Sequence, residues 1–424
     1  MLAFIPITFV IIFFFIFSLF FLRSLGSYEK NFIIKTLFIA LILRMGISFL
    51  YIEVMNRPEL TGPDCFGYIR GGYSISNSWK NLDFDKKYHP KYTPRTHTGY
   101  QYITASFYLL FGTALSTPAY FNALMGIMII MILAKLFLEI FAWGIVRFFI
   151  LSMAFYPSII IWNSAILKDT SILFLAIVAF YGYFQFMYKR SFNHLVWAIL
   201  PLFPLFFIRF YITMVILAVY LFSALISFGN FSIKRIFQTM LVALSVMALL
   251  LVFGLGGEVS TVMENQANVE TLNKHQRNLG IGKTELYEDQ HYNNVGDIVK
   301  YFPIRLIHFL FSPFPWQIVS VNSALGAVEV PLLWFLGVYF IIGLKFCLLH
   351  PKARSFLPII IYAAFLTALY TIVESNIGTI YRMRYQIIPF YFILSGVGLA
   401  VNRAKKLAID TDFILSERMR KHFS

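Results

Sequence analysis

The chain has 424 residues, of which 59% are hydrophobic, 19% are aromatic and only 13% are charged. A soluble domain has about 25% charged residues, so this composition excludes an ordinary soluble protein. The formal net charge of +15 would indicate nucleic-acid binding in a soluble chain, but here the Lys and Arg residues lie mostly in short gaps between apolar runs. We interpret them as topology determinants beside an anionic lipid leaflet, and we expect no nucleic-acid partner.

The residues that commonly bind metals are few and scattered. Cys65 and Cys347 lie far apart in the sequence, which excludes a CxxC site and a disulfide framework. His89, His97 and His308 show no ligand spacing such as that of an HExxH motif. We expect no metal and no other cofactor.

Apolar runs of about 20 residues, the length of one membrane crossing, recur along the chain. They predict an all-α polytopic membrane protein, a single transmembrane domain over residues 1–424 with about eleven transmembrane helices. The first run has no basic region and no small-residue cleavage site, so we expect a retained helix rather than a signal peptide. The expected spans are residues 3–22, 31–53, 117–140, 143–161, 170–187, 192–208, 211–228, 236–254, 328–348, 356–372 and 386–402.

Basic residues set the expected orientation. If the spans alternate, the short basic segments all fall on one side, which is then cytoplasmic because positively charged loops stay inside. The N-terminus and two long polar segments, 54–116 and 255–327, then lie outside, and residues 403–424 form a cytoplasmic tail. Within the long segments we expect an interfacial helix at residues 100–112 and an amphipathic or re-entrant element at residues 301–316. The basic segments are residues 23–35, 135–147, 189–190, 234–235, 345–354 and 403 onward.

Asp64 lies in a Gly62-Pro-Asp turn after the second expected span. A carboxylate held just outside a helix end is able to act as a general base toward an acceptor hydroxyl. Gly-Pro-Asp is also ordinary turn chemistry, so a turn or helix-capping role is the alternative.

Lys168, Asp169 and Arg209 lie at the expected outer ends of later spans. Charged groups beside apolar spans cost about 2.5–3.5 kcal/mol on insertion scales, so they are usually functional or paired. Asp169 is favoured by the dipole at the start of the following helix, which is a structural alternative to a role beside a bound phosphate. Arg209 either extends to the lipid headgroups or points into a cavity that binds an anion.

Arg382 and Arg384 lie on the expected outer side, in the segment 374–389, and so break the positive-inside trend. Topology therefore does not explain them. The planar guanidinium group is suited to bidentate binding of phosphate. We interpret this segment as an anion-binding site.

The order of these motifs resembles that of the C-type (GT-C) glycosyltransferase superfamily, the multi-spanning enzymes that take sugars from polyprenyl-phosphate carriers. The likeness is to the branch of protein O-mannosyltransferases and bacterial aminoarabinose transferases, and it covers roughly residues 50–400. It rests on Asp64 with Tyr68 in the first large outer loop, Tyr92-Thr-Pro-Arg leading to Leu110-Phe-Gly112, Asp169 at the start of a later span, and Arg382-Met-Arg384-Tyr-Gln-Ile-Ile-Pro389.

This resemblance implies a GT-C-like fold with extracytoplasmic amphipathic helices. It also implies transfer of a sugar, with inversion, from a polyprenyl-phosphate donor of the undecaprenyl type to a glycan or lipid acceptor outside the bacterial cytoplasmic membrane. Asp64 would be the catalytic base and Asp169 would support it, and no metal is required because cations neutralise the leaving phosphate. The expected substrate-binding residues are Tyr68, Lys168, Arg209, Glu374, Arg382, Arg384 and Tyr385.

Two other functions fit some of the same features. An O-antigen or capsule polysaccharide polymerase or ligase would join diphosphate-linked repeat units with the outer arginines and needs no acidic base. A transporter of lipid-linked saccharides would carry charged residues at the membrane midplane and internal repeats. In this sequence the charges cluster at one expected face, which favours an enzyme.

Overall fold

A computed structural model describes residues 4–62, 64–84, 98–189, 192–226, 270, 273, 276, 286–287, 292–318 and 321–416. The expected span 236–254, most of the segment 255–291, the stretch 92–95, His89 and His97 lie outside the described residues. The chain divides into two compact units. Unit 1 comprises Met1–Ile216 and Ser416–Met419, and unit 2 comprises Leu217–Leu415 and Arg420–Ser424.

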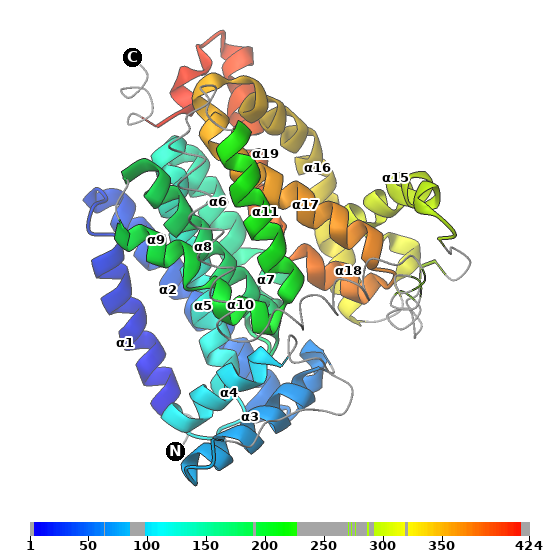
Figure 1. Cartoon of the computed structure of the whole chain (residues 1–424). Helices are drawn as coiled ribbons and strands as arrows, with labels where there is room; N and C mark the ends of the chain where they lie inside the picture. The colour runs from blue at the N-terminus through cyan, green and yellow to red at the C-terminus, as the bar shows by residue number, and fades with distance from the viewer. Residues whose placement is uncertain are drawn as a thin grey trace. The chain divides into compact units, whose positions relative to one another are not determined.

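The described residues form helices and no β-strand (Figure 1). Their order is α1 (Phe4–Phe21), α2 (Ser27–Phe49), η1 (Leu50–Val54), η2 (Pro58–Thr61), α3 (Cys65–Lys80), α4 (Gly99–Phe111), α5 (Thr117–Ile140), α6 (Trp143–Phe155), α7 (Pro157–Asn163), α8 (Lys168–Lys189), α9 (Phe192–Ile199), α10 (Leu202–Ile208), α11 (Phe210–Ile226), α15 (Val295–Phe311), η4 (Pro315–Gln317), α16 (Val321–Leu349), η5 (Pro351–Phe356), α17 (Leu357–Val373), α18 (Ile377–Arg384), α19 (Ile388–Leu407) and η6 (Thr411–Ile414).

Five helical segments in the described residues are long and apolar enough to cross a membrane: α1, α2 continued by η1, α5, α8 and the part of α16 from Gly326. The number rises to seven at most if each of two bent helix pairs crosses as one span. The all-α prediction is therefore confirmed for the described part of the chain, and membrane-spanning helices are present by length and composition. Eleven spans are not confirmed.

The number of expected spans exceeds the number of membrane-crossing helices where the apolar runs form short or interrupted helices. The expected spans 192–208, 211–228 and 356–372 contain apolar helices of 10–17 residues. The expected span 143–161 is two helices, α6 and α7, bent by 59°, and the last expected span begins with a bend of 61° between α18 and α19. Proline explains the first bend, because its ring lacks an N–H and disfavours a helical conformation at the preceding residue. Tyr156, directly before Pro157, is extended with ψ 123°.

A buried arginine completes the break between α6 and α7. In a continuous helix the Met153 carbonyl would accept from the N–H four positions later, but that position is Pro157. Arg44 of α2, which is 0% exposed, supplies the donors instead. Its Nη2 donates to the carbonyl oxygen of Met153 at 3.0 Å, and its Nη1 donates to that of Ala154 at 2.9 Å. The positive charge also complements the partial negative charge at the C-terminus of α6.

Glycines permit the closest helix pairs, as small residues do between membrane helices. In unit 2, a Cβ on Gly343 of α16 would collide with the carbonyl of Leu394 in α19. In unit 1, a Cβ on Gly72 of α3 would press on the side chain of Thr104 in α4. The α3–α4 pair lies at one end of unit 1, at the bottom of Figure 1.

Replacement of Arg44 by Met is expected to lower the thermal unfolding midpoint in detergent. The change leaves two carbonyl groups at the break without their donors, and hydrogen bonds to charged groups are worth about 1.5–3 kcal/mol each. Arg23→Met is the matched control, because Arg23 is exposed beside the Phe20 ring. Equal midpoints for the two variants would contradict the role assigned to Arg44.

Candidate functional site

Asp64 occupies the N-cap position of α3, where it is exposed, and its carboxylate makes no capping hydrogen bond to the first turn of that helix. Gly62 precedes it with a φ of 136°, which suits glycine. Burial, together with the carboxylates of Glu59 and Asp64, raises the pKa of Cys65 to about 11, so this thiol stays protonated at neutral pH. The structure therefore places a solvent-accessible carboxylate at the start of α3 beside an inert cysteine.

Tyr68 lies one turn further along α3 and is buried. Its ring meets that of Tyr100 in α4 edge to face, with centroids 4.8 Å apart and planes at 83°. Burial raises the pKa of Tyr100, and Tyr68, Tyr108 and Asp169 raise it further. The Tyr100 hydroxyl is therefore neutral, and its environment includes the carboxylate of Asp169.

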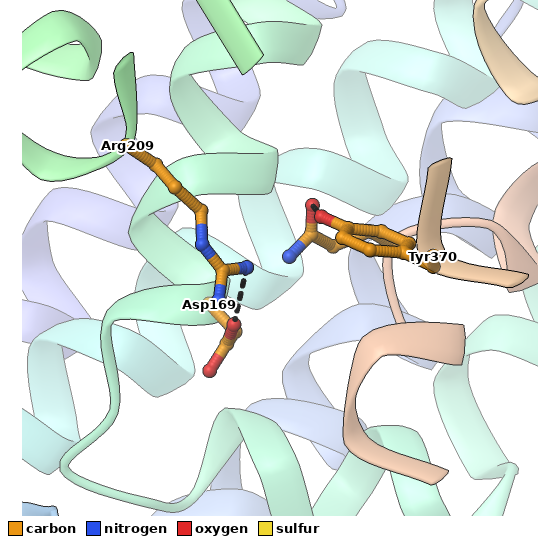
Figure 2. Close-up of polar contacts among 4 residues, drawn as sticks. Asp169, Arg209 and Tyr370 are labelled. Carbon is orange, nitrogen blue, oxygen red and sulfur yellow. Dashed lines mark hydrogen bonds and ion pairs between the residues drawn. The ribbon is translucent and has the colours of Figure 1, made fainter. Parts of the chain in front are cut away.

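Asp169 and Arg209 form a buried ion pair (Figure 2). Asp169 lies in the first turn of α8, where the helix dipole favours a negative charge. Arg209 interrupts the helical path between α10 and α11, with φ −160° and ψ 84°. Its Nη1 lies 3.4 Å from Asp169 Oδ1, and the side chains are only 9% and 2% exposed. Arg209 thus points inward to Asp169 rather than outward to lipid headgroups.

Packing around two glycines brings the Asp64 loop and these charged residues to the same end of unit 1. A Cβ added to Gly62 would touch Leu167 at 3.5 Å, and Leu167 directly precedes the half-buried Lys168. A Cβ on Gly99, at the start of α4, would meet the backbone nitrogen of Ile208 at 2.9 Å, one residue before Arg209. The α3–α4 end of unit 1 therefore combines an exposed carboxylate with a buried carboxylate–guanidinium pair.

The expected arginine segment lies in unit 2, around α18. Arg384 is 4% exposed, and its guanidinium donates from Nε to the carbonyl of Phe309 at 2.9 Å and from Nη2 to the carbonyl of Ser312. In a continuous helix the Phe309 carbonyl would accept from residue 313, which is a proline. Arg384 therefore caps the C-terminus of α15, in the same way that Arg44 caps α6.

The other predicted residues of this segment surround α18. Glu374 is the C-cap of α17 and is buried, Arg382 is half-buried, and Tyr385 follows α18 and is buried. Nearby in the sequence, the Tyr370 hydroxyl donates to Gln386 Oε1 at 2.8 Å (Figure 2). The segment is thus a folded part of unit 2 whose polar groups are largely directed inward.

Arg305 of α15 is a buried cation that the sequence reasoning did not single out. It is 1% exposed, and its guanidinium carbon lies 4.2 Å from the ring centroid of Tyr287 and 4.8 Å from that of Tyr292. Nη1 donates to the Ile372 carbonyl, at the end of α17, at 3.1 Å. Burial lowers the pKa of Arg305, while the tyrosines oppose that shift. The sequence signal that could have identified Arg305 is the presence of an arginine within the expected amphipathic stretch 301–316.

Asn122 of α5 is a further residue that the sequence reasoning missed. It is fully buried and contacts both Tyr100 and the turn before α8. A lone asparagine in an apolar run carries no signal that predicts such contacts.

In comparisons with protein families, with curated proteins and with solved structures, no match to this chain was found. Within the described residues, no group of three or more His, Cys, Asp and Glu side chains is placed to hold a metal ion. The chemistry of the site is therefore argued from its own residues.

Asp169→Asn and Arg209→Gln are each expected to destabilise the folded protein strongly, because breaking a buried pair leaves one charge uncompensated at a cost of about 3–5 kcal/mol. The double variant should be less destabilised than the sum of the single changes. A double-mutant cycle of unfolding free energies in detergent measures this coupling. Strictly additive losses would contradict the pairing.

Proposed function

We propose that this chain is a membrane glycosyltransferase. It transfers a sugar from a polyprenyl-phosphate donor to a glycan or lipid acceptor of the cell envelope, with inversion, at the outer face of a bacterial cytoplasmic membrane. The observation that carries the proposal is the convergence, at the α3–α4 end of unit 1, of the exposed carboxylate of Asp64 with the segments that bear Lys168, Asp169 and Arg209.

Asp64 is the general base in this mechanism. Its accessible carboxylate takes the proton of the acceptor hydroxyl as the acceptor oxygen forms a bond to the anomeric carbon. The bond from that carbon to the phosphate oxygen breaks at the same time, and polyprenyl phosphate leaves with the electron pair. Attack opposite the leaving group inverts the configuration at the anomeric carbon.

Positive charge stabilises the leaving phosphate. Lys168 is half-buried at the start of α8, and its ammonium group is assigned to the leaving phosphate. Asp169 pairs with Arg209 through one carboxylate oxygen and so holds the Arg209 guanidinium in place at this end of unit 1. Asp169 thus serves the phosphate site through Arg209.

Tyr68 borders this site through the α3–α4 packing. In unit 2, Arg382 is half-buried and Arg384 supports its segment by capping α15. Glu374 and Tyr385 belong to the same segment of unit 2.

Asp64→Asn is expected to lower sugar transfer by about 10²–10⁴-fold, the usual contribution of a general base. The measurement is transfer of radiolabel from a panel of polyprenyl-phosphate sugars to a membrane extract of the host by the purified protein in detergent. Glu59→Gln is the matched control, because Glu59 is an exposed carboxylate in the same loop and also lies near Cys65.

Full transfer by Asp64→Asn would contradict the assignment of the base. Absence of transfer from every monophosphate donor in the wild-type protein would contradict the glycosyltransferase itself. Long-chain product from one diphosphate-linked repeat unit would then favour a polymerase, and movement of labelled lipid without covalent change would favour a transporter.

A further inference from the structure

The side chain of Asn122 connects two parts of the site in unit 1. Its Nδ2 lies 2.7 Å from the carbonyl oxygen of Ala165, 2.9 Å from that of Leu167 and 2.9 Å from Tyr100 Oη. Carbonyl oxygens only accept, so the amide nitrogen, which has two hydrogens, must face them. Asn122 is 0% exposed, so water does not replace these bonds.

Gly126, one turn further along α5, packs against the same turn between α7 and α8 that Asn122 contacts. A Cβ at this position would collide with the side chain of Asn163, at the end of α7. Asn163 Oδ1 in turn accepts a hydrogen bond from Thr170 Oγ1 at 3.2 Å, in the first turn of α8. Gly126 therefore makes room for Asn163, and Asn122 donates to the same turn at the carbonyls of Ala165 and Leu167.

The first predicted outer loop, residues 54–116, also contacts Asn122 and the turn between α7 and α8. Tyr100, whose hydroxyl oxygen lies 2.9 Å from Asn122 Nδ2, packs edge to face on Tyr68. Gly62, two residues before Asp64, lies against Leu167, whose carbonyl Asn122 holds. One amide group thus contacts both α4 and the turn that leads into Lys168 and Asp169.

We propose that Asn122 is a positioning residue of the active site. By holding the carbonyls of Ala165 and Leu167, it fixes the first turn of α8 relative to the α3–α4 pair, and so sets Lys168 and Asp169 relative to the loop of Asp64. The position of Arg209 is then fixed as well, because its guanidinium is paired with Asp169. The inference rests on the proposed function for its catalytic consequence, but the positioning itself is measured without any substrate.

The test introduces a cysteine at Lys168 and measures its rate of reaction with a hydrophilic maleimide in the full-length protein in detergent. The two native cysteines are both 0% exposed, so the background reaction is low. Asn122→Ala and Asn122→Asp are then added separately; the second keeps the shape of the side chain but places a carboxylate oxygen against two carbonyls. Thr117→Val is the matched control, because Thr117 is buried on the same helix and donates to the carbonyl of Gly112 instead.

Both Asn122 variants are expected to raise the labelling rate of Lys168→Cys by at least about fivefold, the factor that corresponds to one hydrogen bond of about 1 kcal/mol. Thr117→Val should leave the rate within about twofold, since it removes no bond to the turn. Unchanged protection of Cys65 and Cys347 in the same samples shows that the fold is intact. Wild-type labelling rates in both Asn122 variants would overturn the inference, whatever the transfer activity.

The transfer assay supplies the second readout. In the Lys168-containing protein, Asn122→Asp is expected to lower kcat at least about tenfold with the KM for the lipid donor within about twofold, because misplaced cations lose stabilisation of the transition state and not of the bound donor. A merely structural role would lower the yield of folded protein and leave kcat per folded molecule unchanged, and that result would overturn the positioning role. Absence of transfer in the wild-type protein would contradict the proposed function, and the labelling rates would still decide this inference.

Discussion

A helix end that is buried leaves carbonyl groups that need donors, because water does not reach them to replace the missing bonds. Pro157 after α6 and Pro313 after α15 are two places in the described residues where a proline creates this need. A buried arginine from a distant part of the same unit answers it in each case, Arg44 for α6 and Arg384 for α15. The ends of α6 and α15 therefore depend on buried cations, and not only on apolar packing.

This constraint changes how the charged residues are interpreted. A buried arginine in an apolar chain is not by itself evidence for an anion site, since Arg44 and Arg384 are occupied by backbone carbonyls. Carboxylates play the complementary role at helix starts: Glu53 accepts from the backbone nitrogen and the hydroxyl of Ser116, directly before α5, at 3.3 and 2.5 Å. Functional weight therefore falls on charged side chains that are exposed or half-buried, Asp64 and Lys168 above all.

Much of the helical framework was predictable from the sequence, because apolar runs of the right length report helices directly. Residues 100–112 were expected to form a helix, and α4 is that helix. Pro157 predicts a break in the helix, which the expected span 143–161 did not take into account. The number of spans was not predictable, since short helices such as α10 and α17 have the same composition as full crossings. Length and bends depend on tertiary contacts that periodicity does not report.

The candidate site was predictable in part. Asp64, Lys168, Asp169 and Arg209 were singled out by charge beside apolar runs, and the structure brings their segments to one end of unit 1. The pairing of Asp169 with Arg209 was not foreseen. Neither was Asn122, because an uncharged amide within an apolar run has no sequence signature, and its partners lie about 45 residues away in the chain.

The central claim is that the α3–α4 end of unit 1 is an active site that faces the outside and binds a polyprenyl phosphate. The most direct test is the reaction of Asp64→Cys with a membrane-impermeant maleimide in intact spheroplasts, with and without added polyprenyl phosphate. The account predicts labelling without permeabilisation, and slower labelling when the lipid is present. Labelling only after permeabilisation would contradict the orientation, and a rate that does not change with the lipid would contradict the site.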